Sequence, residues 1–417
     1  MIVEAQSVVV FFCLAAAVLC LGASRPLARM VALAATPLSL LFAWQFPGKV
    51  PLLHTQPLAL FWAGHLTLWF ALVDSRSSPR WIQYPALLLM QAANGVFFTQ
   101  SGLLQIAAWE SVLMGFVLLR CLAALSEADE VMRRSWPVFA GGALVFFGAL
   151  CLRHFEGAIP ESATAFGFTL PDFVFWCLVI GIFLRMPLAP FHGGLNSWTY
   201  RGAFPGGWAL GVWSSLAGAA FFQQTVVPAF GDALLLHASL LLGFAVFSAF
   251  YAAAAATAAR TLREWLSVTP LVFNAIALCA MVLGAAWPYT FLMLIAWPIA
   301  VRALTVVFPN CDLLLEDIRT EIGLSPWGRL WITGALLAVA GFPGSSVFAA
   351  LVPLAHAMGN TQVLVPIALG AVWTLFVASL LPWALAVHRP EAAAARVALN
   401  WAAPVWVVAA FALGRLV

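Results

Sequence analysis

Charged residues are scarce in this 417-residue sequence, at 8% of the total. Soluble domains need about 25% charged residues to cover a water-facing surface. The formal net charge of +3 is also too small for the electrostatic footprint of a nucleic-acid-binding protein. A soluble enzyme and a nucleic-acid reader are therefore both excluded, and no nucleic-acid partner is expected.

Motifs for metals, haem groups and nucleotides are lacking as well. The seven cysteines are odd in number and scattered, mostly within apolar runs. The sequence has no CxxC pair, no Cys/His cluster and no Gly-rich phosphate loop. We therefore expect no cofactor and no metal, and the chain carries no catalytic motif of its own. Lys49 is the only lysine, and the other basic residues are arginine, which indicates a GC-rich, bacterial coding background.

Apolar residues dominate instead, at 64% of the sequence with a mean hydropathy of +1.00. A transmembrane helix needs about 20 mainly apolar residues. The pattern predicts an all-α polytopic membrane protein with about fourteen transmembrane helices. The predicted spans are residues 7–23, 30–46, 56–73, 82–99, 103–125, 137–153, 173–190, 208–228, 234–258, 265–286, 289–308, 330–357, 362–385 and 398–416. Residues 154–172 are expected to form a surface loop, and residues 310–329 an amphipathic interfacial helix.

The distribution of basic residues predicts an orientation, because cytoplasmic loops collect arginine and lysine. With the N-terminus outside, thirteen basic residues fall in inner loops, and only Lys49, Arg153 and Arg415 fall in outer loops. We therefore expect a multi-pass protein of the bacterial inner (cytoplasmic) membrane, with the lipid bilayer as its surroundings. Both termini would lie on the outer (periplasmic) side.

Proline interrupts two of the predicted spans. Pro187 and Pro190 lie near the end of the seventh span, and Pro343 lies within Gly341-Phe-Pro-Gly-Ser-Ser346 in the twelfth. A proline inside a helix removes a backbone donor and frees a carbonyl group. At membrane depth, broken helices of this kind are typical of ion-translocating cores.

Two broken helices that lie five spans apart predict two inverted repeats of about five helices each. The expected organisation has four parts. They are an N-terminal three-helix segment at 1–80, a first repeat at 81–232, a second repeat at 233–388 and a C-terminal transmembrane helix at 389–417.

Few ionisable residues lie inside the apolar spans, where a charge is expensive and indicates function by default. Glu110 lies in the fifth span, Arg185 near the end of the seventh and Arg302 in the eleventh, and His192 follows the seventh. Two interpretations stay open for each. Glu110 and Arg185 can be a functional site or a structural ion pair that locks two helices. Arg302 can instead be a packing or snorkelling arginine, as can Arg120, and His192 a capped interfacial histidine.

Several of these residues lie in motifs of a known family. Arg185-Met-Pro-Leu-Ala-Pro-Phe-His-Gly-Gly-Leu195 resembles the K-x-P-x-x-P-F-H-x-W-L signature of the antiporter-like subunits of respiratory complex I, Mrp cation/proton antiporters and membrane-bound hydrogenases. Trp109-Glu110 resembles the W-E of their fifth helix. Ala340-Gly-Phe-Pro-Gly-Ser-Ser-Val-Phe348, with Thr320-Glu-Ile-Gly-Leu324 before it, resembles their twelfth helix. Residues 261–269 weakly resemble a further motif, and the resemblance covers residues 80–385 in the same order.

The resemblance implies the fourteen-helix fold with two inverted repeats and a proton path at mid-membrane. Glu110 matches the glutamate of the fifth helix, and Arg185 takes the place of its lysine partner on the seventh. Arg302 falls near a lysine of the eleventh helix. Leu216 and Leu351 fall near the titratable positions of the eighth and twelfth helices. Because arginine stays charged at all ordinary pH values, the family's chain of titratable groups is incomplete here.

Three functions compete. The first is a proton- or cation-translocating subunit of a multisubunit complex, whose redox or other chemistry would belong to membrane or peripheral partner subunits. Its translocated species would be protons or monovalent cations, with Glu110, Arg185, His192 and Arg302 along the path. The second is the membrane subunit of a DAB-type inorganic-carbon uptake system, which is proton-driven and has a zinc-containing partner. The third is a degenerate structural subunit that moves no ions.

Overall fold

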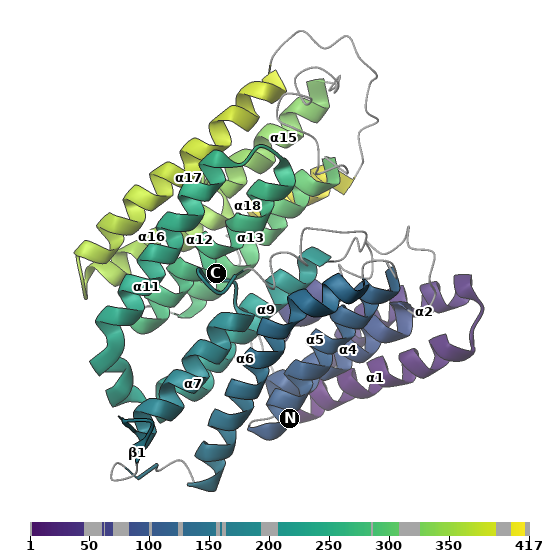
Figure 1. Ribbon diagram of the computed structural model, residues 1–417. Helices are drawn as coiled ribbons and strands as arrows, with labels where there is room; N and C mark the ends of the chain where they lie inside the picture. Colours follow the sequence, from purple (N-terminus) through teal and green to yellow (C-terminus); the bar gives the residue numbers. More distant parts are fainter. Residues whose placement is uncertain are drawn as a thin grey trace. The chain divides into compact units, whose positions relative to one another are not determined.

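Figure 1 shows the computed structural model, which describes residues 2–45, 61, 63–69, 83–99, 102–123, 128–155, 159–160, 164–192, 207–284, 287–307, 326–388 and 402–412. Helices make up nearly all of these residues. They are α1 (Ile2–Gly22), α2 (Arg25–Gln45), α4 (Gln83–Thr99), α5 (Leu103–Ala123), α6 (Ala128–His154), α7 (Leu170–Arg185), α9 (Gly207–Phe221), the π-helical turn η3 (Phe222–Val226), α10 (Val227–Ala229), α11 (Gly231–Ala258), α12 (Leu262–Val282), α13 (Trp287–Val307), α15 (Pro326–Val339), α16 (Ser346–Gly359), α17 (Leu364–His388) and α18 (Ala402–Ala412).

The predicted fold class, an all-α polytopic membrane protein, is confirmed. Five of the described helices are long and apolar enough to cross a bilayer. They are Leu103–Leu122, Ala128–His154, Gly231–Ala258, Leu262–Val282 and Leu364–Val387, and several shorter apolar helices accompany them. The number of fourteen spans stays a prediction. The expected interfacial helix at 310–329 lies outside the described residues, except for residues 326–329, which begin α15.

The expected surface loop at 154–172 contains a short hairpin. Strand β1 (Thr164–Ala165) pairs antiparallel with β2 (Phe168–Thr169). The two residues between them, Phe166 and Gly167, have φ values of 53° and 84°. Positive φ at both central residues is the geometry of the tight hairpin turns whose twist matches that of the strands.

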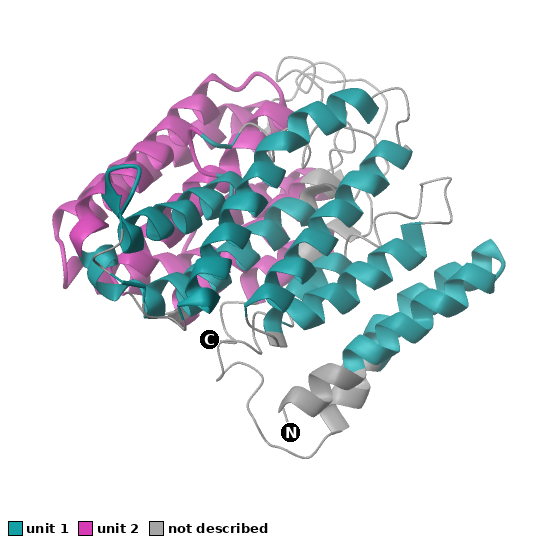
Figure 2. Cartoon of the chain, turned by 60° about the horizontal axis from the view of Figure 1, so that its bottom comes forward, with its two compact units in different colours: residues 1–187, 191–235 teal, residues 188–190, 236–417 magenta. Residues whose placement is uncertain are grey.

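The chain forms two compact units, which Figure 2 colours separately. The first unit comprises residues 1–187 and 191–235, and the second comprises residues 188–190 and 236–417. In the first unit α4 packs on α1 and α5, while α6 packs on α5 and α7. In the second unit α13 packs on α12, α15, α16 and α18. The four-part division at residues 80, 232 and 388 stays a prediction.

The predicted break of the seventh span is confirmed and falls directly after Arg185. Thr169 caps the start of α7, since its hydroxyl accepts a hydrogen bond from the Asp172 backbone N–H at 3.3 Å. The helix itself begins at Leu170. It ends because Pro187 disfavours helical geometry at the residue before it, and Met186 is accordingly extended, with φ −94° and ψ 116°. The Ala189–Pro190 peptide that follows is cis.

The predicted break of the twelfth span is also confirmed, because α15 ends at Val339 and α16 begins at Ser346. Gly341 and Gly344 have φ values of 69° and 95°, which favour glycine. Ser345 caps α16, since its hydroxyl accepts a hydrogen bond from the Phe348 backbone N–H at 3.2 Å. Both breaks are therefore turns that the local sequence specifies.

Candidate functional site

An ion pair joins α5 to the broken end of α7 in the first unit. The Glu110 carboxylate accepts a hydrogen bond from Arg185 Nη2. The Arg185 side chain is 0% exposed, whereas 36% of the Glu110 side chain is exposed. The expected contact between these two residues is thus present. Arg185 is thus a cation shielded from solvent, whereas the Glu110 carboxylate is accessible from outside the chain.

Three further groups hold Arg185 in place. Its guanidinium carbon lies 4.8 Å from the centre of the Trp109 ring, at cation–π distance. Its Nε donates a hydrogen bond of 3.4 Å to the Val138 carbonyl of α6. Its own carbonyl, at the end of α7, accepts a 2.6 Å hydrogen bond from Ser214 of α9. Nη1 has no hydrogen-bond partner among the residues that the structure describes.

Glycine in α6 makes room for the ion pair. A methyl group added at Gly142 would overlap Arg185 Nη2 and Glu110 Oε1. The neighbouring Gly141 meets Gly181 of α7, and a methyl group on either would lie 2.8 or 2.7 Å from the other's carbonyl oxygen. Small residues let helices approach closely in a membrane. This role of Gly141 and Gly142 was not predicted, although a glycine pair inside an apolar span is a visible signal of close helix packing.

An aromatic wall borders the pair. The buried Trp109 ring lies 5.5 Å from Phe97 of α4 and 5.5 Å from Phe221 of α9, measured between ring centres. Phe97 also lies 5.8 Å from Trp213 of α9. Arg185 is therefore buried beside aromatic rings, and electrostatic interactions are stronger in such apolar surroundings than in water. Trp109 was noted only as part of a motif, and its contact with Arg185 required the structure.

The predicted residues after Arg185 lie in the non-helical segment that follows α7. Pro187 and His192 belong to the first unit, and His192 is half-buried. Pro190 belongs to the second unit with Leu188 and Ala189, whose backbone N–H donates a 2.8 Å hydrogen bond to Ser248 of α11. The segment 188–190 therefore has a polar partner for a buried backbone N–H, as buried polar groups in a membrane protein require.

The remaining predicted residues are not part of the ion pair, and Arg302, Pro343 and Leu351 lie in the second unit. Arg302 is half-buried on α13, and Pro343 is exposed between α15 and α16. Leu351 lies on α16 beside Gly341, where a methyl group on the glycine would lie 3.4 Å from the leucine side chain. In the first unit, Leu216 is 0% exposed on α9.

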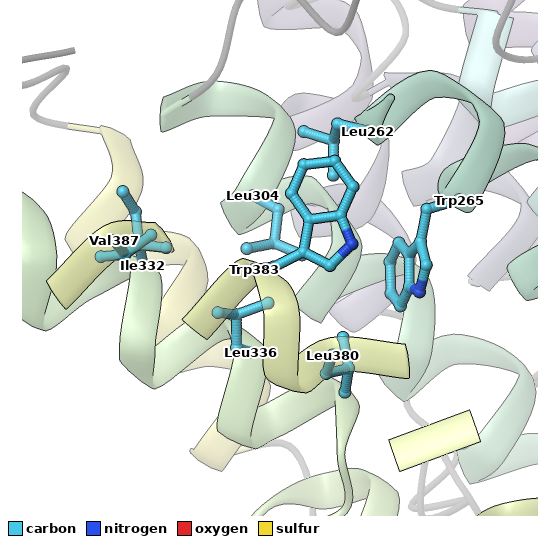
Figure 3. Close-up of a pocket in the computed structure, with 8 residues that line it drawn as sticks. All are labelled: Leu262, Trp265, Leu304, Ile332, Leu336, Leu380, Trp383 and Val387. Atoms are coloured by element: carbon cyan, nitrogen blue, oxygen red, sulfur yellow. The ribbon is translucent and has the colours of Figure 1, made fainter. Parts of the chain in front are cut away.

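The interior of the second unit is apolar and aromatic. Trp265 and Trp297 lie close to Phe273, Trp373 and Phe376 in one continuous cluster of rings. Figure 3 shows a small pocket beside this cluster. The pocket is lined by two tryptophans and six aliphatic side chains: Leu262, Trp265, Leu304, Ile332, Leu336, Leu380, Trp383 and Val387. Among the described residues, the fully buried polar side chains of this unit are hydroxyls and one amide.

The chemistry available at the ion pair is proton exchange at the carboxylate. Arginine stays protonated, so Arg185 is a fixed charge, and Glu110 is the titratable partner. Within the described ranges, no three His, Cys, Asp or Glu side chains lie together as a metal site.

No protein-family model and no curated protein matches this sequence. Solved structures of membrane complexes do match the fold. A chain of respiratory complex I from Thermus thermophilus superposes with a TM-score of 0.79 at 18% identity, over 100% of this chain and 98% of that chain. A chain of the Mrp complex from Dietzia sp. gives a TM-score of 0.75 at 14% identity, over 99% and 94%. A chain of the archaeal membrane-bound sulfane sulfur reductase gives 0.76 at 14%, over 99% and 93%.

These matches span nearly the whole length of both chains in each comparison. The protein therefore has the fold of membrane chains found in respiratory and Mrp complexes, as its sequence motifs implied. It is a multi-pass membrane protein.

Proposed function

We propose that this chain is the antiporter-like membrane subunit of a multisubunit complex, and that it moves protons or monovalent cations in step with a reaction of its partners. The observation that carries the proposal is the Glu110–Arg185 ion pair at the broken end of α7. It lies on a fold shared with chains of complex I, the Mrp complex and sulfane sulfur reductase.

In this proposal Glu110 loads and releases the proton. Arg185 is buried inside the unit and is a fixed positive charge beside the carboxylate. A change in the distance between the two side chains changes the electrostatic interaction between them. A partner that moves α5 or the segment after α7 would thereby drive proton uptake and release.

The onward path differs from the family's pattern. The positions of Leu216 and Leu351 offer no titratable group, so water or a partner subunit must carry the proton beyond Glu110. His192 and Arg302 are the remaining candidates along the path, His192 as a carrier and Arg302 as a fixed charge. The proposed location is the bacterial inner membrane with both termini on the periplasmic side, as the distribution of arginine favours.

The partner decides between the two transport functions. A zinc-containing partner would favour the DAB-type inorganic-carbon uptake system, and redox subunits would favour a respiratory complex. Mild-detergent purification through a tag on this chain, followed by identification of the co-purifying proteins, separates the two.

The test of ion translocation uses the natively purified complex in liposomes. An imposed potassium diffusion potential drives protons inward, and a trapped pH dye records the flux. Glu110→Gln should abolish the flux while the complex still assembles, because glutamine hydrogen-bonds but does not titrate. Glu130→Gln is the matched control, since Glu130 is an exposed carboxylate paired with Arg134 on α6. If Glu110→Gln assembles and conducts at the wild-type rate, the chain is a structural subunit instead.

A further inference from the structure

A second buried polar cluster lies in the first unit, on helices that the ion pair does not use. It comprises Cys13 of α1, Thr36 of α2, His65 in the helical segment 63–69, and Gln91 and Asn94 of α4. His65, Thr36, Gln91 and Asn94 are each 0% exposed. Polar side chains in the apolar interior of a membrane protein are costly and mark functional positions by default.

Hydrogen bonds connect the cluster around His65. The Thr36 hydroxyl donates to Gln91 Oε1 at 3.0 Å, and Gln91 Nε2 donates to the His65 backbone carbonyl at 3.4 Å. The Cys13 sulfur lies 4.0 Å from His65 Nε2. The titratable neighbour of His65 in this cluster is thus the Cys13 thiol from α1, while α2 and α4 present neutral hydroxyl and amide groups.

Asn94 links this cluster to the helix that supports the ion pair. Its Nδ2 donates to the Phe61 carbonyl at 3.2 Å, and the Phe61 ring stacks on His65 at 5.6 Å. Its Oδ1 accepts a 2.8 Å hydrogen bond from the Trp213 indole of α9. The next residue along α9 is Ser214, which donates to the carbonyl of Arg185.

A second connection runs through aromatic rings. Trp213 contacts Phe97, and Phe97 contacts Trp109, whose ring lies under the Arg185 guanidinium. The His65 cluster therefore reaches both the backbone and the side chain of Arg185 through packed groups of a single unit.

We propose that His65 is a second proton-binding site of the first unit and that it is coupled to Glu110–Arg185 through Asn94 and Trp213. This inference rests on the proposed function. It adds a second proton-binding position, on helices near the N-terminus, to the one proposed at Glu110. A histidine ring has two nitrogens, each of which can bind or release a proton. The imidazole takes one proton at one ring nitrogen and gives one up from the other, so no net charge is left behind.

The alternative is a structural role for His65, in which the hydrogen bonds of the cluster stabilise helix packing and no proton is bound. Two substitutions separate these roles. His65→Gln keeps a hydrogen-bonding side chain but cannot titrate. Thr36→Val is the matched control, because it removes a hydrogen bond from the same cluster without removing a titratable group.

The experiment measures proton flux in liposomes that contain the natively purified complex, as a function of pH. His65→Gln should assemble, lower the flux about 10-fold or more, and change the dependence of the rate on pH. Thr36→Val should keep both the wild-type profile and a flux within about 2-fold of wild type. A wild-type rate and profile for His65→Gln, or equal losses for both variants, would overturn the proposal.

Two further comparisons cover the cases in which His65→Gln fails to assemble or has no effect on the flux. If His65→Gln fails to assemble, Trp213→Phe replaces it, because it keeps the ring and removes only the indole donor to Asn94. A shifted pH profile in that variant supports the coupling, and an unchanged profile overturns it. If Glu110→Gln is inactive while His65→Gln is unaffected, this inference alone fails. If both variants conduct normally, the proposed function itself fails.

Discussion

Because Arg185 is fully buried and Glu110 is partly exposed, replacing Glu110 should destabilise the protein more than replacing Arg185. Glu110→Gln leaves a cation that is 0% exposed without a counter-charge, whereas Arg185→Gln leaves a carboxylate that is 36% exposed and can keep part of its hydration. The double substitution removes both charges. A double-mutant cycle on this pair therefore tests whether the two side chains act as one unit.

The magnitudes follow from these exposures. Removing one partner of a buried ion pair costs about 3–5 kcal/mol. In Glu110→Gln the amide oxygen still accepts a hydrogen bond, and the Trp109 ring keeps a cation–π contact of about 1–2 kcal/mol, so we expect a loss of about 2–3 kcal/mol. Arg185→Gln should cost about 1–2 kcal/mol because the remaining carboxylate is partly hydrated. The double variant should also lose only about 1–2 kcal/mol, which leaves a coupling energy of about 2–3 kcal/mol.

The assay is unfolding of the purified chain in mixed detergent micelles with a rising fraction of SDS, followed by the fluorescence of its 19 tryptophans. A control cycle on Glu130 and Arg134 measures an exposed pair within one helix, with side chains 47% and 38% exposed. That pair should couple by about 0.3–0.5 kcal/mol. If the losses for Glu110→Gln and Arg185→Gln simply add, the two residues are not a coupled pair and the reasoning is wrong.

Two other predictions concern helix packing and topology. Gly142→Ala should separate the Glu110–Arg185 pair and lower both stability, by about 1–3 kcal/mol, and proton flux. Gly148→Ala on the same helix meets only Leu178 side-chain carbons and should keep the flux, so equal losses of flux in the two variants would contradict the packing argument. A reporter active in the cytoplasm should stay dark when fused after Val417 and be active in the 74–80 loop. The reverse pattern would overturn the expected orientation.

Much of the fold could be predicted because the bilayer imposes simple rules. Long apolar runs must be helices, and two prolines close together or a proline between glycines can end one, so both breaks could be located from sequence. The break after Arg185 falls where Pro187 restricts Met186. The hairpin before α7 was not predicted, because it depends on the conformations of Phe166 and Gly167, which a loop-like composition does not reveal.

The candidate site was predicted only in part. Glu110 and Arg185 were recognisable because charges are rare in apolar spans, and their pairing follows from the cost of leaving either alone. Other groups that position them are neutral and gave no such signal: the Trp109 face and the Ser214 hydroxyl become visible only in three dimensions. His65, Gln91 and Asn94 were not predicted as candidates. They lie inside predicted spans, where a polar side chain indicates function just as a charged one does.

The central claim is that the Glu110 carboxylate carries the translocated proton. The most direct measurement is the proton flux per assembled complex in liposomes for wild type, Glu110→Asp and Glu110→Gln, with assembly quantified for each. We predict that Glu110→Asp retains a remnant of the flux, because its shorter side chain still titrates, and that Glu110→Gln has none. A wild-type flux per complex in Glu110→Gln would contradict the claim and make this chain a structural subunit.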